Sequence, residues 1–85
     1  MSRTEFTYGQ LDRALKSLGF SCRISSTGQH SRLYEHKASG AWAVIPPFPE
    51  SDHVLDYHLI GVRKTLDEFG IAEPKIFDRE LQKAA

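Results

Sequence analysis

The sequence predicts an α+β domain in which helices cover one face of a small antiparallel sheet. Two observations lead to this prediction. Apolar residues recur at helical spacing in two segments, and three segments between them alternate with the period of a strand. The chain has 85 residues, 40% hydrophobic and 26% charged, a composition typical of one domain with a single small core. We therefore expect a helix, three strands and a helix, with residues 1–85 forming a single domain.

The first helix is expected at residues 8–18. Thr7 and Gln10 have the spacing of a capping box, in which a hydroxyl and an amide satisfy free N–H groups at a helix start. Gly19 supplies the residue type that often ends a helix in a left-handed conformation. The apolar positions between them recur four and three residues apart and are Leu11, Leu15 and Leu18.

Three antiparallel strands are expected at residues 20–25, 30–36 and 41–45. In the first, one alternating phase is apolar and is expected to face the core: Phe20, Cys22 and Ile24. The segment 37–40 has the length of a hairpin loop. The third strand stops abruptly because prolines, which cannot donate a backbone hydrogen bond, follow it: Pro46, Pro47 and Pro49.

A second helix is predicted by an apolar stripe at spacings of four, three, four and three: Leu55, Leu59, Val62, Leu66 and Phe69. Ser51, Asp52 or Asp56 is expected to cap its start, and Gly70 to end it. The tail beyond it, residues 72–85, is compatible with a short terminal helix that has Pro74 in its first turn. Its apolar residues, Ile76, Phe77 and Leu81, either complete the core or contact a partner.

The charge balance and the cysteine content exclude several classes of protein. Eleven basic residues balance eleven acidic ones, which argues against a strongly basic nucleic-acid binder. Residues 1–47 nevertheless hold six basic against three acidic residues, and residues 48–85 hold five against eight. The single cysteine, Cys22, excludes an intramolecular disulfide and favours the reducing cytosol. With no long apolar stretch, we expect a cytoplasmic protein without a membrane span.

The four histidines do not have metal-ligand spacing. His30 and His36 would lie about 20 Å apart on one strand, and His53 and His58 are five residues apart, which does not place them on one helix face. The glycines do not form a phosphate-binding loop. We expect neither a metal nor another cofactor.

One group of residues suits RNA chemistry. Gly28 ends a turn that brings His30 to the start of a strand, and Arg23 lies on the preceding strand. The residues that share the alternating phase of His30 are Arg32, Tyr34 and His36. If that phase faces solvent, guanidinium groups can hold phosphates, and a histidine with a pKa near neutrality can move protons to and from a ribose 2′-hydroxyl.

Residues 7–71 resemble a HicA-type toxin, the RNA-cleaving partner of HicA/HicB toxin–antitoxin modules, whose fold is like a double-stranded-RNA-binding domain. The family pattern is a helix ending in leucine-x-x-glycine-aromatic, a turn with glycine, serine and histidine, a valine-proline strand end and a helix closing on glycine-isoleucine. The segments that meet it are residues 15–20, 28–30, 44–46 and 59–71.

The resemblance implies a metal-independent endoribonuclease that cleaves mRNA, with His30 at the position of the catalytic histidine and Gly28 as the turn glycine. Arg23 and Arg32 would neutralise the phosphate. A HicB-like antitoxin is the implied partner. Three residues depart from the pattern where the family has serine or histidine: Gln29, Ser31 and Phe48. The alternative is a non-catalytic module of the same fold that binds RNA or protein, and the sequence leaves the oligomeric state open.

Overall fold

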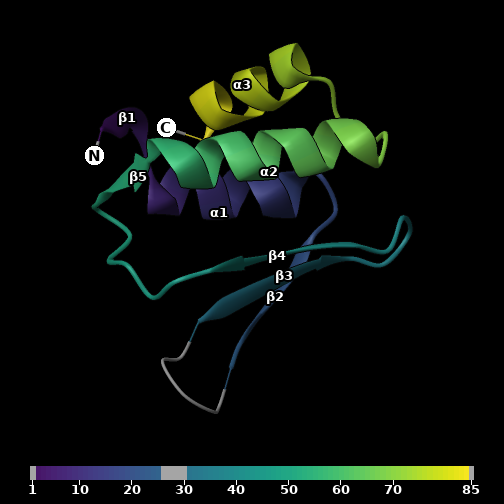
Figure 1. The fold of residues 1–85 in the computed structure, drawn as a ribbon, viewed down its shortest axis with the longest axis horizontal. Helices are drawn as coiled ribbons and strands as arrows, with labels where there is room; N and C mark the ends of the chain where they lie inside the picture. Colours follow the sequence, from purple (N-terminus) through teal and green to yellow (C-terminus); the bar gives the residue numbers. More distant parts are fainter. Residues whose placement is uncertain (1, 26–30, 85) are drawn as a thin grey trace.

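The computed structural model describes residues 2–25 and 31–84. Within them, the element order is β1 (Arg3–Thr7), α1 (Tyr8–Ser17), β2 (Ser21–Ile24), β3 (Arg32–His36), β4 (Ala41–Ile45), β5 (His53–Leu55), α2 (Asp56–Glu68) and α3 (Pro74–Lys83). Strands β2, β3 and β4 form an antiparallel sheet in that order, and β1 pairs with β5 in a second, two-stranded sheet. Helices α1 and α2 lie on the same side of the three-stranded sheet, and α3 lies beyond them (Figure 1). The predicted α+β architecture is confirmed.

Helix α1 begins as the sequence predicts. The Gln10 N–H donates to Thr7 Oγ1 at 3.2 Å, and the Thr7 N–H donates to Gln10 Oε1 at 2.9 Å, which completes the capping box. The helix ends one residue earlier than predicted, with Leu18 as its cap. Gly19 follows at φ 98°, a backbone conformation that a residue with a Cβ rarely adopts.

The three-stranded sheet has one face under the helices. Tyr34, in the middle strand β3, pairs with Cys22 of β2 and with Ala43 of β4, and its side chain is fully buried. Because side chains alternate between faces, Arg32 and His36 lie on the same side as Tyr34. Strand β4 has the predicted bounds and β2 is shorter than predicted. Strand β3 begins at Arg32, and the predicted start at residue 30 lies outside the described residues.

The prediction for the inward face of β2 is only partly correct. Phe20, which precedes the strand, is buried, but Cys22 is half-buried and Ile24 is 62% exposed. The β2–β3 end of the sheet projects beyond the helices (Figure 1). Ile24 therefore lies on the predicted face of the sheet but is not buried by the helices.

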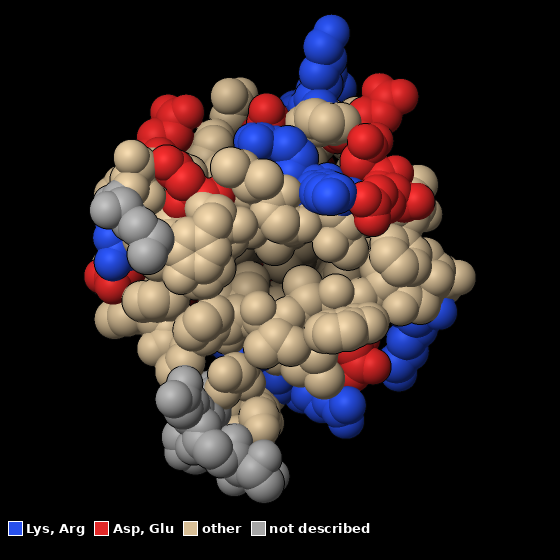
Figure 2. All heavy atoms as spheres, in the orientation of Figure 1, with Lys and Arg blue, Asp and Glu red and all other residues tan. Residues whose placement is uncertain are grey.

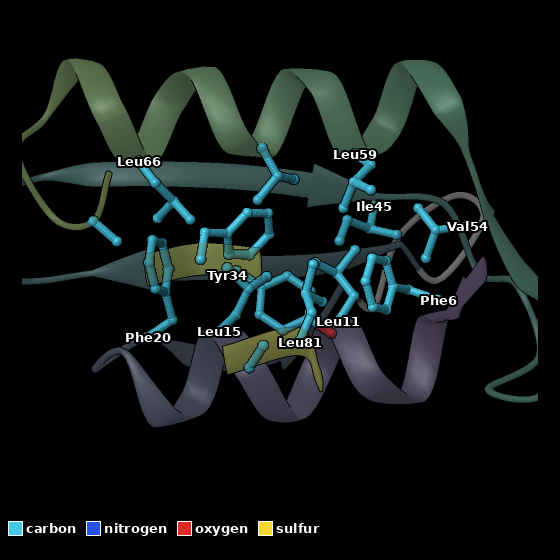
Figure 3. Close-up of a cluster of buried hydrophobic side chains, with 14 of the residues drawn as sticks. Phe6, Leu11, Leu15, Phe20, Tyr34, Ile45, Val54, Leu59, Leu66 and Leu81 are labelled. Atoms are coloured by element: carbon cyan, nitrogen blue, oxygen red, sulfur yellow. The ribbon is translucent and has the colours of Figure 1, made fainter. Parts of the chain in front are cut away.

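The core lies between the helices and the sheet and draws on both (Figure 3). Its largest fully buried side chains are Tyr34, Phe77, Leu11, Leu15, Leu66, Leu81 and Val54. Two of these, Phe77 and Leu81, come from α3. Of the two alternatives for the tail, its packing in the core is therefore the one that the structure has. Arg13 of α1 further fixes α3 by donating to the Ala84 carbonyl at 2.9 and 2.7 Å.

The β1–β5 sheet was not predicted. Arg3 pairs with Leu55 and Thr7 with His53, with an irregularity between them. Arg3 Nη1 also donates to the His53 carbonyl at 2.6 Å. Strand β5 has three residues, too few for a period-two pattern to be distinguished from a loop.

Helix α2 differs from prediction at its start. Its N-cap is Leu55, without a side-chain capping bond, and Asp56 occupies the first turn, where a carboxylate interacts favourably with the helix dipole. None of the predicted capping residues caps the helix. No helix among the described residues is long and apolar enough to cross a bilayer.

Candidate active site

The predicted site centres on the connection between β2 and β3. The Ser25 N–H donates to the Ser31 carbonyl at 2.9 Å, which extends the pairing of β2 and β3 beyond Ile24 and Arg32. Gly28 and His30, the predicted turn glycine and catalytic histidine, lie outside the described residues. The described part of the site is therefore the surface on both sides of this hairpin end.

A groove of about 450 Å³ lies between α1 and the edge of β2. Both predicted phosphate-binding residues, Arg23 and Arg32, border it, together with Lys16 of α1. Its other lining residues are Asp12, Cys22, Ile24 and Glu50. Three cationic side chains thus meet two carboxylates at one edge of the sheet.

Arg32 lies on the helix side of the sheet and is mostly buried. Its Nη2 is 3.8 Å from Glu50 Oε1. The interaction with the Tyr34 hydroxyl, together with the nearby carboxylates, raises the pKa of Arg32 against the opposing effect of burial. This guanidinium is consequently a fixed positive charge in the lining of the groove.

Arg23 projects from the opposite face of the sheet, because its neighbour Ile24 is the residue that pairs with Arg32. Its Nε is 3.1 Å from Glu35 Oε1, and both side chains are well exposed to solvent. An exposed ion pair contributes little stability. Arg23 is therefore held only weakly and can turn toward a ligand.

The alternating phase of Arg32, Tyr34 and His36 faces the helices and not solvent. The Tyr34 hydroxyl donates to Asp12 Oδ1 at 2.6 Å, and burial, followed by this hydrogen bond, raises the pKa of Tyr34. Asp12 is itself buried, and its Oδ2 lies 3.1 Å from Lys16 Nζ. The condition that this phase faces solvent is not met, because the Tyr34 side chain is part of the core.

His36 has a structural role at the other end of β3. Its Nδ1 is 2.8 Å from Ser39 Oγ in the β3–β4 turn, and its ring packs on Phe20 with centroids 5.1 Å apart. Its Nε2 also lies against Gly19. These contacts hold the turn, and His36 is not part of the groove.

Three groove residues were missed by sequence reasoning: Asp12, Lys16 and Glu50. The first two are four residues apart, and this spacing alone places them on one helix face. Glu50 belongs to the loop between β4 and β5, which packs on α1 because the Gly9 N–H donates to the Glu50 carbonyl at 3.0 Å. A Cβ at Gly9 would lie 3.3 Å from that oxygen, so the glycine permits the close approach.

Phe48, where the HicA pattern has a histidine, packs in an aromatic cluster away from the groove. Its ring stacks on Tyr8 with centroids 4.8 Å apart. Tyr8 OH accepts the Leu55 N–H at 3.2 Å and lies 2.8 Å from His58 Nδ1. Burial lowers the pKa of His58, which keeps this imidazole neutral near neutral pH.

In residues 2–25 and 31–84, no group of three His, Cys, Asp or Glu side chains lies close enough together to hold a metal ion. Comparisons with protein-family models, with curated proteins and with solved structures find no match for this chain. The case for a function therefore rests on the groove and on the sequence pattern.

Proposed function

We propose that the chain is a HicA-like toxin, an endoribonuclease that cleaves mRNA without a metal and uses His30 for proton transfer. The observation that carries this proposal is the groove beside β2. It gathers Lys16, Arg23 and Arg32 next to the hairpin end, and His30 directly precedes Ser31 of that end in the sequence.

The order of the elements supports the fold that the resemblance implies. Helix α1, strands β2, β3 and β4, and helix α2 follow one another in the α-β-β-β-α order, with both helices on one face of the sheet (Figure 1). We propose that this part of the chain is a double-stranded-RNA-binding-domain-like unit. The β1–β5 sheet and α3 are additions to that pattern.

The proposed chemistry divides the work between a proton carrier and cations. His30 acts either as the base that takes the 2′-hydroxyl proton or as the acid that protonates the leaving 5′-oxygen. As the 2′-oxygen bonds to phosphorus and the bond to the 5′-oxygen breaks, negative charge builds on the phosphoryl oxygens. Arg32 and Arg23 are the groups expected to stabilise that charge.

The ion pairs of these arginines are compatible with RNA binding. Glu50 is 3.8 Å from Arg32, and Glu35 is 3.1 Å from Arg23, in pairs with at least one exposed partner. Such pairs are worth about 0–1 kcal/mol, and a phosphate offers a guanidinium two oxygens in good geometry. Phosphate can therefore replace the carboxylates. A HicB-like antitoxin would silence the enzyme by covering the same end of the sheet.

Induced expression in a bacterium tests the proposal. The wild-type chain should arrest growth and fragment cellular mRNA, and the purified protein should cleave RNA in the presence of EDTA. His30→Ala should abolish cleavage with an unchanged circular dichroism spectrum. His53→Ala is the matched control, because His53 is exposed on β5 and away from the groove, and it should retain activity.

A non-catalytic RNA- or protein-binding module is the second candidate. It is favoured by the pairing of both arginines with carboxylates and by the balance of charges over the chain. A wild-type chain that leaves RNA intact at high expression would overturn the nuclease. Retarded RNA migration without cleavage would then identify the binding module.

A further inference from the structure

Strand β4 forms one edge of the three-stranded sheet and lacks the usual protection of an edge. In the described part of the chain, β3 is the only strand that pairs with it. Its five residues, Ala-Trp-Ala-Val-Ile, carry no charge. Edge strands are normally protected by charged residues, bulges or a covering element, because their free N–H and C=O groups can pair with another strand.

The space beside β4 is open and apolar. A groove of about 240 Å³ runs between β4 and α2, lined by Trp42, Ala43, Val44, Ile45, His58, Gly61, Val62 and Thr65. None of these residues is charged at neutral pH. Figure 2 shows the corresponding surface as uncharged and hollowed, with charged side chains above and below it. A strand added about 4.8 Å from β4 would enter this groove.

Two further observations fit a second molecule at this edge. Trp42 is 63% and Val44 51% exposed on the outer face of β4, a large apolar area for a strand of five residues. Gly61 lies in the middle of α2, and a Cβ there would meet nothing within 4 Å. Among the residues that the structure describes, no contact requires this glycine, although glycine weakens a helix. Close approach of another molecule would account for it.

We propose that β4 pairs antiparallel with β4 of a second copy of this chain, around a two-fold axis at Ala43. This register pairs all five residues. It sets Trp42 opposite Val44 of the second copy on the outer face, an aromatic–β-branched pair that stabilises antiparallel strands. It also sets Ala43 opposite Ala43 of the second copy, so a small side chain lies on the two-fold axis. The proposal is independent of the proposed nuclease activity.

The sequence of β4 is compatible with pairing to a copy of itself. A two-fold axis brings identical residues together, so a charged strand would repel its own copy, and this strand has no charge. The assembly also closes as a dimer, because an isologous interface uses up the surface that forms it. The other edge strand of the sheet, β2, differs from β4 because it carries the charged Arg23. Pro46 and Pro47 follow β4 and limit the length over which it can pair.

Sedimentation equilibrium of the full chain, from low micromolar to submillimolar concentration, tests the dimer. The wild-type mass should rise from 9.6 kDa toward twice that value. Val44→Lys places a charge on the exposed side of β4 and should weaken the dimer at least tenfold. Ile24→Lys is the matched control: it makes the same kind of change at an exposed residue of the other edge strand and should leave the dissociation constant unchanged.

Amide hydrogen exchange of the wild-type chain gives a readout that does not depend on how a variant folds. Amides of residues 41–45 that are not bonded to β3 should exchange more slowly as concentration rises, and those of β2 should not change. A wild-type chain that stays monomeric over the whole range overturns the proposal. Equal weakening by Val44→Lys and Ile24→Lys, or concentration-independent exchange in β4, does the same.

Discussion

The two edges of the three-stranded sheet differ in the chemistry they offer. Along β2, the groove against α1 is lined by cations and carboxylates: Arg23, Arg32, Lys16, Asp12 and Glu50. Along β4, the groove against α2 is apolar and uncharged. A chain with no net charge thus has a polar groove at one edge of the sheet and an apolar groove at the other. Net charge alone would have predicted neither.

Both edges depend on the middle strand, and removing Tyr34 should have the largest effect. Tyr34→Ala deletes a fully buried ring and the hydrogen bond to the buried Asp12. We expect the free energy of unfolding to fall by about 3–5 kcal/mol, measured by urea denaturation, with loss of function at both edges. Tyr57→Ala is the control, because Tyr57 is mostly exposed. A loss as small as that of the control would show that the two edges do not share this support.

Glu35→Gln should sharpen the difference between the edges. It removes the carboxylate that pairs with Arg23 at 3.1 Å and leaves the guanidinium free for phosphate. An exposed pair is worth up to about 1 kcal/mol, so we expect RNA affinity at low salt to rise by up to about fivefold. Fluorescence anisotropy with a labelled RNA measures it.

Glu68→Gln provides the matched control for that experiment. It makes the same change in an exposed pair with Lys64 on α2, away from the β2 groove. If both variants raise affinity equally, the gain comes from overall charge and the polar edge has no special role. In either variant, added salt should weaken RNA binding.

The smallest expected effect concerns His58 beside the β4 groove. Burial holds the pKa of His58 in the folded chain below its ordinary 6.5. Between these two values the unfolded state binds more protons than the folded state, so stability decreases as the pH falls through this window. His58→Gln should therefore lose less thermal stability than the wild type between about pH 7.5 and about pH 5.5. An identical decrease in both would show that His58 does not titrate in this way.

Local signals in the sequence predicted much of the fold. The capping box of α1 and the bounds of β4 follow from residues close together in the chain. The β1–β5 pair does not, because it joins residues about fifty positions apart. The exposure of Ile24 could not be predicted either. Strand alternation assigns a residue to a face of the sheet but does not show where the covering helices end.

The candidate site was predictable only in part. Arg23 and Arg32 do border one groove, as their adjacent strands suggested, although they project from opposite faces. Glu50 reaches the groove through the packing of a loop on Gly9, and no sequence periodicity encodes such a contact. Sequence reasoning identified two of the three cations of the site, Arg23 and Arg32, but missed Lys16 and both carboxylates.

Helix α3 has a consequence for how the chain is made. Phe77 and Leu81 are fully buried in the core with residues of α1 and α2, and α3 is the last of the described elements to leave the ribosome. A nascent chain that has completed only α2 lacks these two side chains and leaves that part of its core open. We therefore expect the core to close only after α3 has emerged. If the chain is the toxin we propose, we expect this order to delay the assembly of an active enzyme until α3 has left the ribosome.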